Sequence, residues 1–162
     1  MVRARDLSPA AGQYLQLALL AAGHARVAAS VGDAACAAEF LAAERAARAA
    51  GLGLWADPHY LINKAENPAE ILAQRGRFAV VAGKVLSVRE SGATIYVNFG
   101  RRWSEDFTVT ILKRNQRRFT AARLNLNNLA GRHVRVRGTI EERSGPWIEA
   151  MHPEQIEIAE RD

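Results

Sequence analysis

The hydrophobic pattern of this 162-residue chain changes from a helical period to a strand period near Arg77. Before that residue, an alanine-rich segment repeats its apolar side chains every three or four positions, as amphipathic helices do. After it, apolar and polar residues alternate, which is typical of half-buried strands. We therefore predict a helical part over residues 1–57, a connector over residues 58–76, and a β-rich domain over residues 77–160.

Two helices are predicted in the first part, over residues 12–24 and from Asp33 to about residue 50. Asp33 is a good N-cap, because its carboxylate can accept hydrogen bonds from backbone N–H groups of the first turn. Gly51 is placed to end the second helix in a left-handed conformation. Alanine-rich helices of this length are marginally stable alone, so they must pack on another part of a protein.

Three strands, a helix and two further strands are predicted beyond Arg77. The strands cover residues 78–89, 94–99, 106–112, 132–142 and 147–150, and the helix lies within residues 113–129. Gly83 lies in the middle of the first strand, where we expect a strong bend. This is the element order of a five-stranded oligonucleotide- and oligosaccharide-binding (OB) barrel. The predicted fold class is therefore α+β, mainly β, with a helix between strands 3 and 4.

Positive charge is concentrated in the predicted barrel. Residues 77–138 contain thirteen Lys and Arg against three Asp and Glu, although the net charge of the whole chain is only +5. The helical part is balanced, and the C-terminal segment is acidic. A basic segment that also carries aromatic residues indicates a surface that faces a polyanion.

OB barrels bind single strands by stacking bases on aromatic side chains while cations follow the phosphates. Tyr96 and His133 are candidate stacking residues, because alternation places each opposite the core-facing side of its strand. Trp103 lies in a predicted loop, where a tryptophan is less needed for packing, so it is a candidate contact residue. Phe99 and Trp147, in contrast, are expected to pack in the barrel. We expect single-stranded DNA or RNA as the partner, in preference to duplex. The candidate cations are Arg101, Arg102, Lys113, Arg114, Arg117, Arg118, Arg135 and Arg137.

Other kinds of site lack the residues they need. Cys36 is the one cysteine, which excludes an intrachain disulfide, and we expect it to be a small buried residue. The acidic pairs at residues 105–106 and 141–142 are neighbours on strands, so their side chains would point to opposite faces. We expect no catalytic residue, no metal site and no cofactor. Neither a bilayer-spanning stretch nor a secretory signal is evident, so the expected location is the cytoplasm.

Both halves of the chain resemble the thermonuclease (staphylococcal-nuclease-like) family. Residues 19–27, 36–44 and 49–56 resemble the C-terminal part of the nuclease domain. Residues 96–100, 103–109, 131–138 and 152–157 resemble the accessory OB module that some bacterial members carry. The resemblance implies a nucleic-acid-binding protein with an incomplete N-terminal domain followed by an OB domain.

Family catalysis uses carboxylates that hold a calcium ion and two arginines that stabilise phosphoryl charge. In the register of residues 19–27, all of these positions fall before Met1, and Arg3 and Arg5 do not have the sequence context of the family's arginines. We therefore expect no catalytic residue here, and calcium only in a full-length family member.

Two other functions remain open on the sequence. The first is that the chain is a fragment of a calcium-dependent phosphodiesterase whose activity needs the missing N-terminal strands. Alternatively, the barrel is an interaction module that grips an acidic protein or a membrane surface. An incomplete N-terminal domain would have to pack on the barrel, self-associate or stay loosely ordered, because it would expose a strand edge and an apolar helix face.

Overall fold

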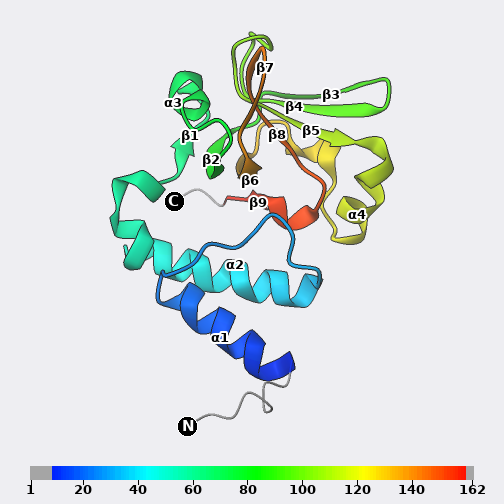
Figure 1. The fold of residues 1–162 in the computed structure, drawn as a ribbon. Helices are drawn as coiled ribbons and strands as arrows, with labels where there is room; N and C mark the ends of the chain where they lie inside the picture. Colours follow the sequence, from blue (N-terminus) through cyan, green and yellow to red (C-terminus); the bar gives the residue numbers. More distant parts are fainter. Residues whose placement is uncertain (1–8, 160–162) are drawn as a thin grey trace. The chain divides into compact units, whose positions relative to one another are not determined.

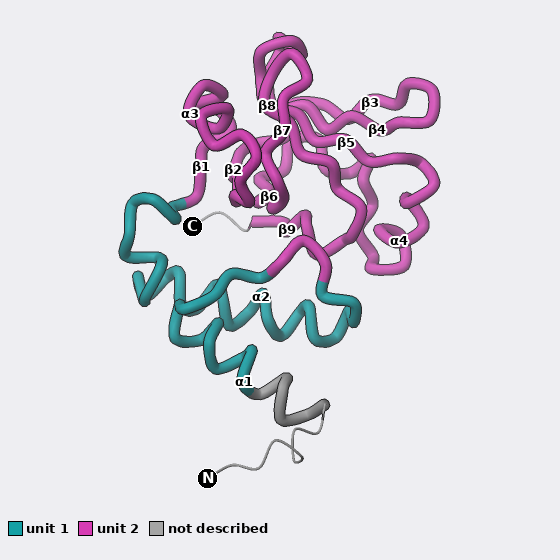
Figure 2. Tube along the Cα trace, viewed as in Figure 1, with its two compact units in different colours: residues 1–27, 31–61 teal, residues 28–30, 62–162 magenta. Residues whose placement is uncertain are grey.

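A computed structural model describes residues 9–159, so Arg3 and Arg5 lie outside the described residues (Figure 1). The chain divides into two compact units (Figure 2). Unit 1 contains residues up to 27 and residues 31–61, and unit 2 contains residues 28–30 and residues from 62 onward. Within the described range, no helix is long and apolar enough to cross a bilayer.

Unit 1 is helical, with α1 over Pro9–Ala21 and α2 over Ala34–Ala49. Two 3₁₀ turns follow, η1 over Gly53–Ala56 and η2 over Pro58–Tyr60. Both predicted helices are confirmed, and the first begins at Pro9, earlier than predicted. Asp33 caps α2 as predicted, since its Oδ1 accepts the N–H groups of Ala35 and Cys36, both at 2.9 Å. These hydrogen bonds stabilise the charged carboxylate, and the bond from Cys36 contributes most to lowering the pKa of Asp33.

The end of α2 follows the predicted glycine stop. Gly51 has a φ of +62°, and the next residue, Leu52, donates its N–H to the Ala47 carbonyl at 3.0 Å. Cys36 is half-buried against the small core of Leu20, Val27 and Phe40, so it is less covered than predicted.

A close backbone contact in unit 1 requires two more glycines. Gly23 has a φ of +74° and Gly53 a φ of +54°, and an added Cβ at Gly23 would lie 2.2 Å from the Leu52 carbonyl oxygen. The Leu54 N–H donates to the Gly23 carbonyl at 2.8 Å, which joins the turn after α1 to η1.

Over residues 62–159, unit 2 contains nine strands and several short helices. The sheet orders are β1-β2-β6-β9 and β3-β4-β5-β8-β7. The strands are β1 (Asn63–Lys64), β2 (Phe78–Lys84), β3 (Ser87–Ser91), β4 (Thr94–Asn98), β5 (Thr108–Leu112), β6 (His133–Thr139), β7 (Glu141–Arg143), β8 (Gly145–Glu149) and β9 (Ile156–Ile158). The helices are α3 (Pro68–Leu72), η3 (Lys113–Asn115), α4 (Gln116–Ala121), η4 (Leu126–Leu129) and η5 (Pro153–Gln155).

This topology is of the OB type, as predicted. The first barrel strand is β2 followed by β3, and the fourth is β6 followed by β7, so each of these strands passes from one sheet into the other (Figure 1). The third strand, β5, pairs in parallel with β8, the fifth. Hydrogen bonding leaves two sheets rather than one closed barrel, and the fold class is α+β.

The core of unit 2 follows the predicted alternation. Ile95, Val97, Val109 and Ile111 are buried on β4 and β5 and belong to one hydrophobic cluster. Phe99 is partly buried, and its ring lies 5.0 Å from that of Phe107. The outward residues of these two strands are therefore presented on the opposite face of the five-stranded sheet.

The first barrel strand changes sheet two residues later than predicted. Val85 donates its N–H to the Arg132 carbonyl beside the four-stranded sheet, and Leu86 donates to Asn98 in the other sheet. Gly83 stays within β2, where an added Cβ would lie 2.5 Å from the Cβ of Ala65. Glycine is required there by close packing and not by the bend.

The helix predicted within residues 113–129 is interrupted. It consists of η3, α4 and η4, with Arg123 in a left-handed conformation at φ +60° between α4 and η4. Phe119, Leu126 and Leu129 are buried in the barrel core. The exposed cations of this segment are Arg114, Arg117 and Arg118, which precede Phe119, and Arg123, which follows it.

Candidate nucleic-acid interface

A groove of about 760 Å³ runs over the outer face of β3 and β4. It is formed by the β3–β4 hairpin and by the loop that connects β4 to β5. Three of the predicted binding residues lie in it, one on β4 and two on the loop. Its lining residues are Leu86, Ser87, Arg89, Glu90, Ser91, Tyr96, Asn98, Gly100, Arg101 and Trp103.

The floor of the groove combines a cation with an aromatic ring. Tyr96 is half-buried and lies directly opposite Arg89, which is exposed, in the antiparallel pair of β3 and β4. Residues directly opposite each other in such a pair project from the same face. The next pair on this face is Ser87 and Asn98, whose Nδ2 lies 3.4 Å from the Ser87 Oγ.

Arg101 and Trp103 form one end of the groove. The Trp103 side chain is 74% exposed, which is unusual for so large an apolar residue. Arg101 is exposed beside it. Both residues line the groove, and a contact role for this loop stays a prediction.

The loop that holds them is braced from within. The Asp106 Oδ2 accepts the N–H of Arg102 at 2.8 Å, and the Asp106 N–H donates to the Arg102 carbonyl at 2.8 Å. Gly100 allows this carboxylate to approach, since an added Cβ there would lie 2.0 Å from it. The guanidinium of Arg102 lies 2.9 Å from Glu105, so its charge is already balanced.

The cations of η3 and α4 lie outside the groove. Lys113 pairs with Glu90 at 2.9 Å, next to the hairpin turn. Arg118 donates to the Met151 carbonyl at 3.3 Å. Arg114 and Arg117 are exposed on the same segment, so the predicted cluster exists as a second basic surface.

On the fourth barrel strand, the structure corrects the prediction that Arg135 and Arg137 form part of the binding surface. His133, Arg135 and Arg137 lie on β6, in the other sheet from Tyr96. Arg137 is fully buried, and its Nη2 lies 3.4 Å from the Glu157 Oε2. A buried, paired guanidinium is not accessible to a phosphate.

Arg135 is largely buried beside it. Its Nη1 lies 4.0 Å from Glu157, which pairs with it across β6 and β9. Alternation along β6 does place Arg135 and Arg137 on one side of the strand, but β9 covers that side with a carboxylate. Only His133 of the three is exposed, opposite Lys84 on β2.

Sequence reasoning missed Arg89 as a groove residue. A signal for it was present, because the turn at residues 91–94 fixes the register of the hairpin. Counting back from that turn pairs residue 89 with residue 96. Asn98 and Leu86 were also missed.

No cluster of three or more His, Cys, Asp or Glu among residues 9–159 could hold a metal ion.

Trp147, which the sequence predicts to pack in the barrel, is buried on β8.

No family model matches the chain, and no curated protein does. The thermonuclease resemblance therefore stays a prediction.

Solved structures with partial similarity include the OBody AM1L10 bound to hen egg-white lysozyme, at 25% identity and a TM-score of 0.41. That match covers 58% of this chain and 91% of the OBody. The aspartyl-tRNA synthetase from Entamoeba histolytica matches at 12% identity and a TM-score of 0.41, over 66% of this chain and 23% of the synthetase. With scores this low, neither similarity carries a conclusion about function.

Proposed function

We propose that unit 2 binds single-stranded nucleic acid, DNA or RNA, in the groove over β3 and β4. The observation that carries this proposal is the convergence of an exposed Trp103 with Tyr96, Arg89 and Arg101 around one groove. Bases would stack on the two aromatic rings, while the two guanidinium groups would follow the phosphates.

A single strand suits this groove better than a duplex does. Tyr96 is half-buried and lines the groove, with residues of β3 and of the loop among the other lining residues. A ring in this position can stack on the face of an unpaired base, whereas base faces inside a duplex are covered by their neighbours.

The basic surface of η3 and α4 would add long-range attraction. Between Asp106 and Glu141 the sequence has no acidic residue, and Arg114 and Arg117 are exposed on this basic stretch. These cations, with Lys113 and Arg118, raise the local concentration of a polyanion near the groove. We assign them a supporting role, because the aromatic side chains lie in the groove and not beside them.

An acidic protein partner is the competing interpretation. A carboxylate-rich peptide would satisfy the arginines but would offer no flat ring to Trp103 and Tyr96. Competition experiments separate the two: an unlabelled oligonucleotide should displace a bound labelled strand at much lower concentration than polyglutamate of equal charge.

The direct test measures binding of a fluorescently labelled oligothymidylate by anisotropy, at several salt concentrations, with a duplex of the same length as comparison. We expect binding that weakens with salt and prefers the single strand. Absence of binding at low salt, or equal affinity for polyglutamate, would contradict the proposal.

A separate expectation about catalysis follows from the family resemblance. We propose that this chain binds nucleic acid without cleaving it, since the residues that resemble the family carry none of its catalytic set. Incubation with DNA and calcium, followed by electrophoresis, should leave the DNA intact. Calcium-dependent digestion by this chain would contradict that proposal.

A further inference from the structure

A second cation and aromatic pair lies on the same sheet as the groove, on β7 and β8. The Arg143 Cζ lies 4.1 Å from the centroid of the Trp147 ring. Trp147 is only 5% exposed, and its Nε1 donates to the Thr110 Oγ1 at 2.6 Å. The hydrogen bond to Thr110 therefore fixes the indole against the neighbouring strand β5, while Arg143 is exposed.

The pairing register places this stack on the groove's face. Thr110 lies directly opposite Tyr96 across β4 and β5. Thr108 pairs with Asn98 on one side and with Trp147 on the other. Neighbouring strands lie about 4.8 Å apart, so Trp147 is about 10 Å from Asn98 across the sheet.

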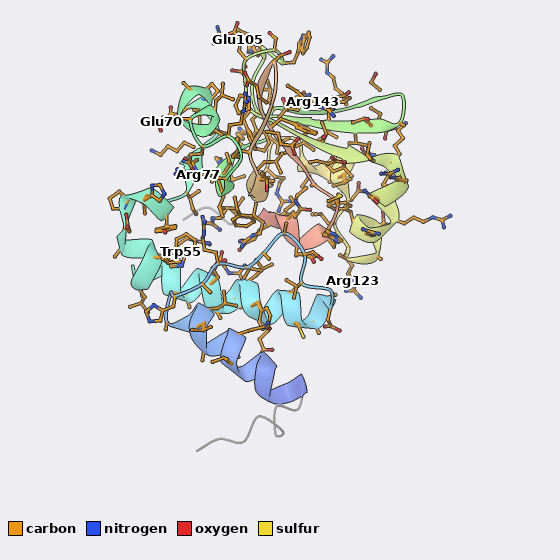
Figure 3. All side chains as sticks on the ribbon, viewed as in Figure 1. Trp55, Glu70, Arg77, Glu105, Arg123 and Arg143 are labelled. Atoms are coloured by element: carbon orange, nitrogen blue, oxygen red, sulfur yellow. The ribbon has the colours of Figure 1, made fainter. Side chains whose placement is uncertain are left out.

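The turn that carries Arg143 is also packed against the loop that carries Trp103. Ser144 turns the chain with a φ of +66°, and Gly145 follows it. An added Cβ at Gly145 would lie 2.8 Å from the Glu105 carbonyl oxygen, so the two backbones are in close contact. Figure 3 labels Glu105 and Arg143 on this part of unit 2.

We propose that Arg143, carried on the Trp147 ring, is a second stacking site for an unpaired nucleobase of the strand bound in the groove. This inference rests on the proposed function. A guanidinium is planar, so a base can stack on the face that Trp147 leaves open. No carboxylate within residues 9–159 lies within ion-pair distance of Arg143, so its planar group is available.

A base is favoured over a phosphate at this position by the surrounding charge. Glu141 lies opposite Trp147 across β7 and β8. Glu149 lies opposite Thr110 across β5 and β8. Both project from the face that carries the stack, where they would repel a phosphate but not the face of a neutral base.

Substitutions at Arg143 separate stacking from charge. Arg143→Ala and Arg143→Lys should each weaken binding of a twelve-residue oligothymidylate about 5-fold or more, the lower end of the loss of one stacked base. Neither should change the salt dependence. The matched control is Arg75→Ala, which removes an exposed cation paired with Glu142 on β7 and should leave affinity unchanged.

Two results in this series would overturn the inference. Wild-type affinity in Arg143→Ala would assign the stack a purely structural role. Wild-type affinity in Arg143→Lys, together with a shallower salt dependence in Arg143→Ala, would assign Arg143 to a phosphate. Trp103→Ala in the same series distinguishes failure of this inference from failure of the proposed groove. This variant should weaken binding whether or not Arg143 contacts a base.

Crosslinking tests the same contact without any variant. A strand carrying 5-iodouridine, irradiated on the wild-type protein, should mark a peptide that contains residues 141–149 in addition to one that contains Trp103. Marking of the Trp103 peptide alone would overturn the inference and leave the groove in place. Marking of neither would count against both.

Discussion

Arg89 and Tyr96 lie directly opposite each other on β3 and β4, so a cation and an aromatic ring share one face of a two-stranded ribbon. Under the proposed function, this pairing would let the groove contact both the base and the phosphate of a nucleotide. The ring offers a stacking surface, and the guanidinium is positioned for the phosphate beside it.

The exposed Trp103 should provide the largest single contribution to binding. We predict that Trp103→Ala weakens affinity for a single strand by about 1–3 kcal/mol, or about 5- to 150-fold, as expected for the loss of one stacked base. Anisotropy titration measures the change. Leu61→Ala is the control, because it removes an apolar side chain that is 53% exposed in unit 1. Equal affinity of the two variants would remove Trp103 from the interface.

The groove arginines should appear in the salt dependence. Arg89→Ala and Arg101→Ala should each reduce the slope of log K against log salt by about 0.7, the value for one phosphate contact on a single strand. Titrations at four or more salt concentrations measure this slope. Unchanged slopes with reduced affinity would mean that these guanidinium groups do not contact phosphates.

Arg137 should matter for stability and not for binding. Arg137→Met removes one partner of a buried ion pair and leaves Glu157 with reduced compensation. We expect a loss of about 3 kcal/mol in the free energy of unfolding, measured by urea denaturation. Affinity per folded molecule should be unchanged. A variant with wild-type stability and weakened binding would restore Arg137 to the interface.

The brace of the Trp103 loop should control affinity indirectly. Asp106→Ala removes the acceptor of the Arg102 N–H, so Trp103 should move more freely and bind less well. Tryptophan fluorescence anisotropy should fall in the free protein. Glu105→Gln is the control, since it breaks only an exposed pair and leaves the brace intact. It should bind as well as the wild type or slightly more tightly at low salt, because Arg102 is then free.

Unit 1 should exchange its amide hydrogens faster than unit 2. Its buried cluster contains Leu20, Val27 and Phe40, whereas that of unit 2 joins residues from both sheets and α4. Fewer buried apolar contacts mean a lower free energy of local opening. Hydrogen exchange followed by mass spectrometry checks this, and uniform protection of both units would contradict it.

Local patterns predicted much of this fold. Alternation over residues 94–98 placed Tyr96 outside and Ile95 inside, and the Asp33 and Gly51 signals bounded α2. These features depend on residues close in sequence, so periodicity and capping reveal them.

Non-local pairing was less accessible to sequence reasoning. Alternation along β6 could not show that β9 brings Glu157 against Arg135 and Arg137. Likewise, β1 has only two residues, too few for a period, yet it pairs with β2. On the β4–β5 loop, the position of Trp103 in a predicted loop pointed to an exposed side chain, and it is exposed. On β6, charge and alternation together suggested an exposed face, whereas Arg137 is buried.

Amide chemical-shift mapping during titration with a short oligothymidylate tests the central claim most directly. We predict that the largest shifts fall within residues 86–103, on β3, β4 and the loop after them, with indole shifts at Trp103. Shifts confined to β6 and β9, to the surface of α4, or to unit 1 would contradict a single strand bound in this groove.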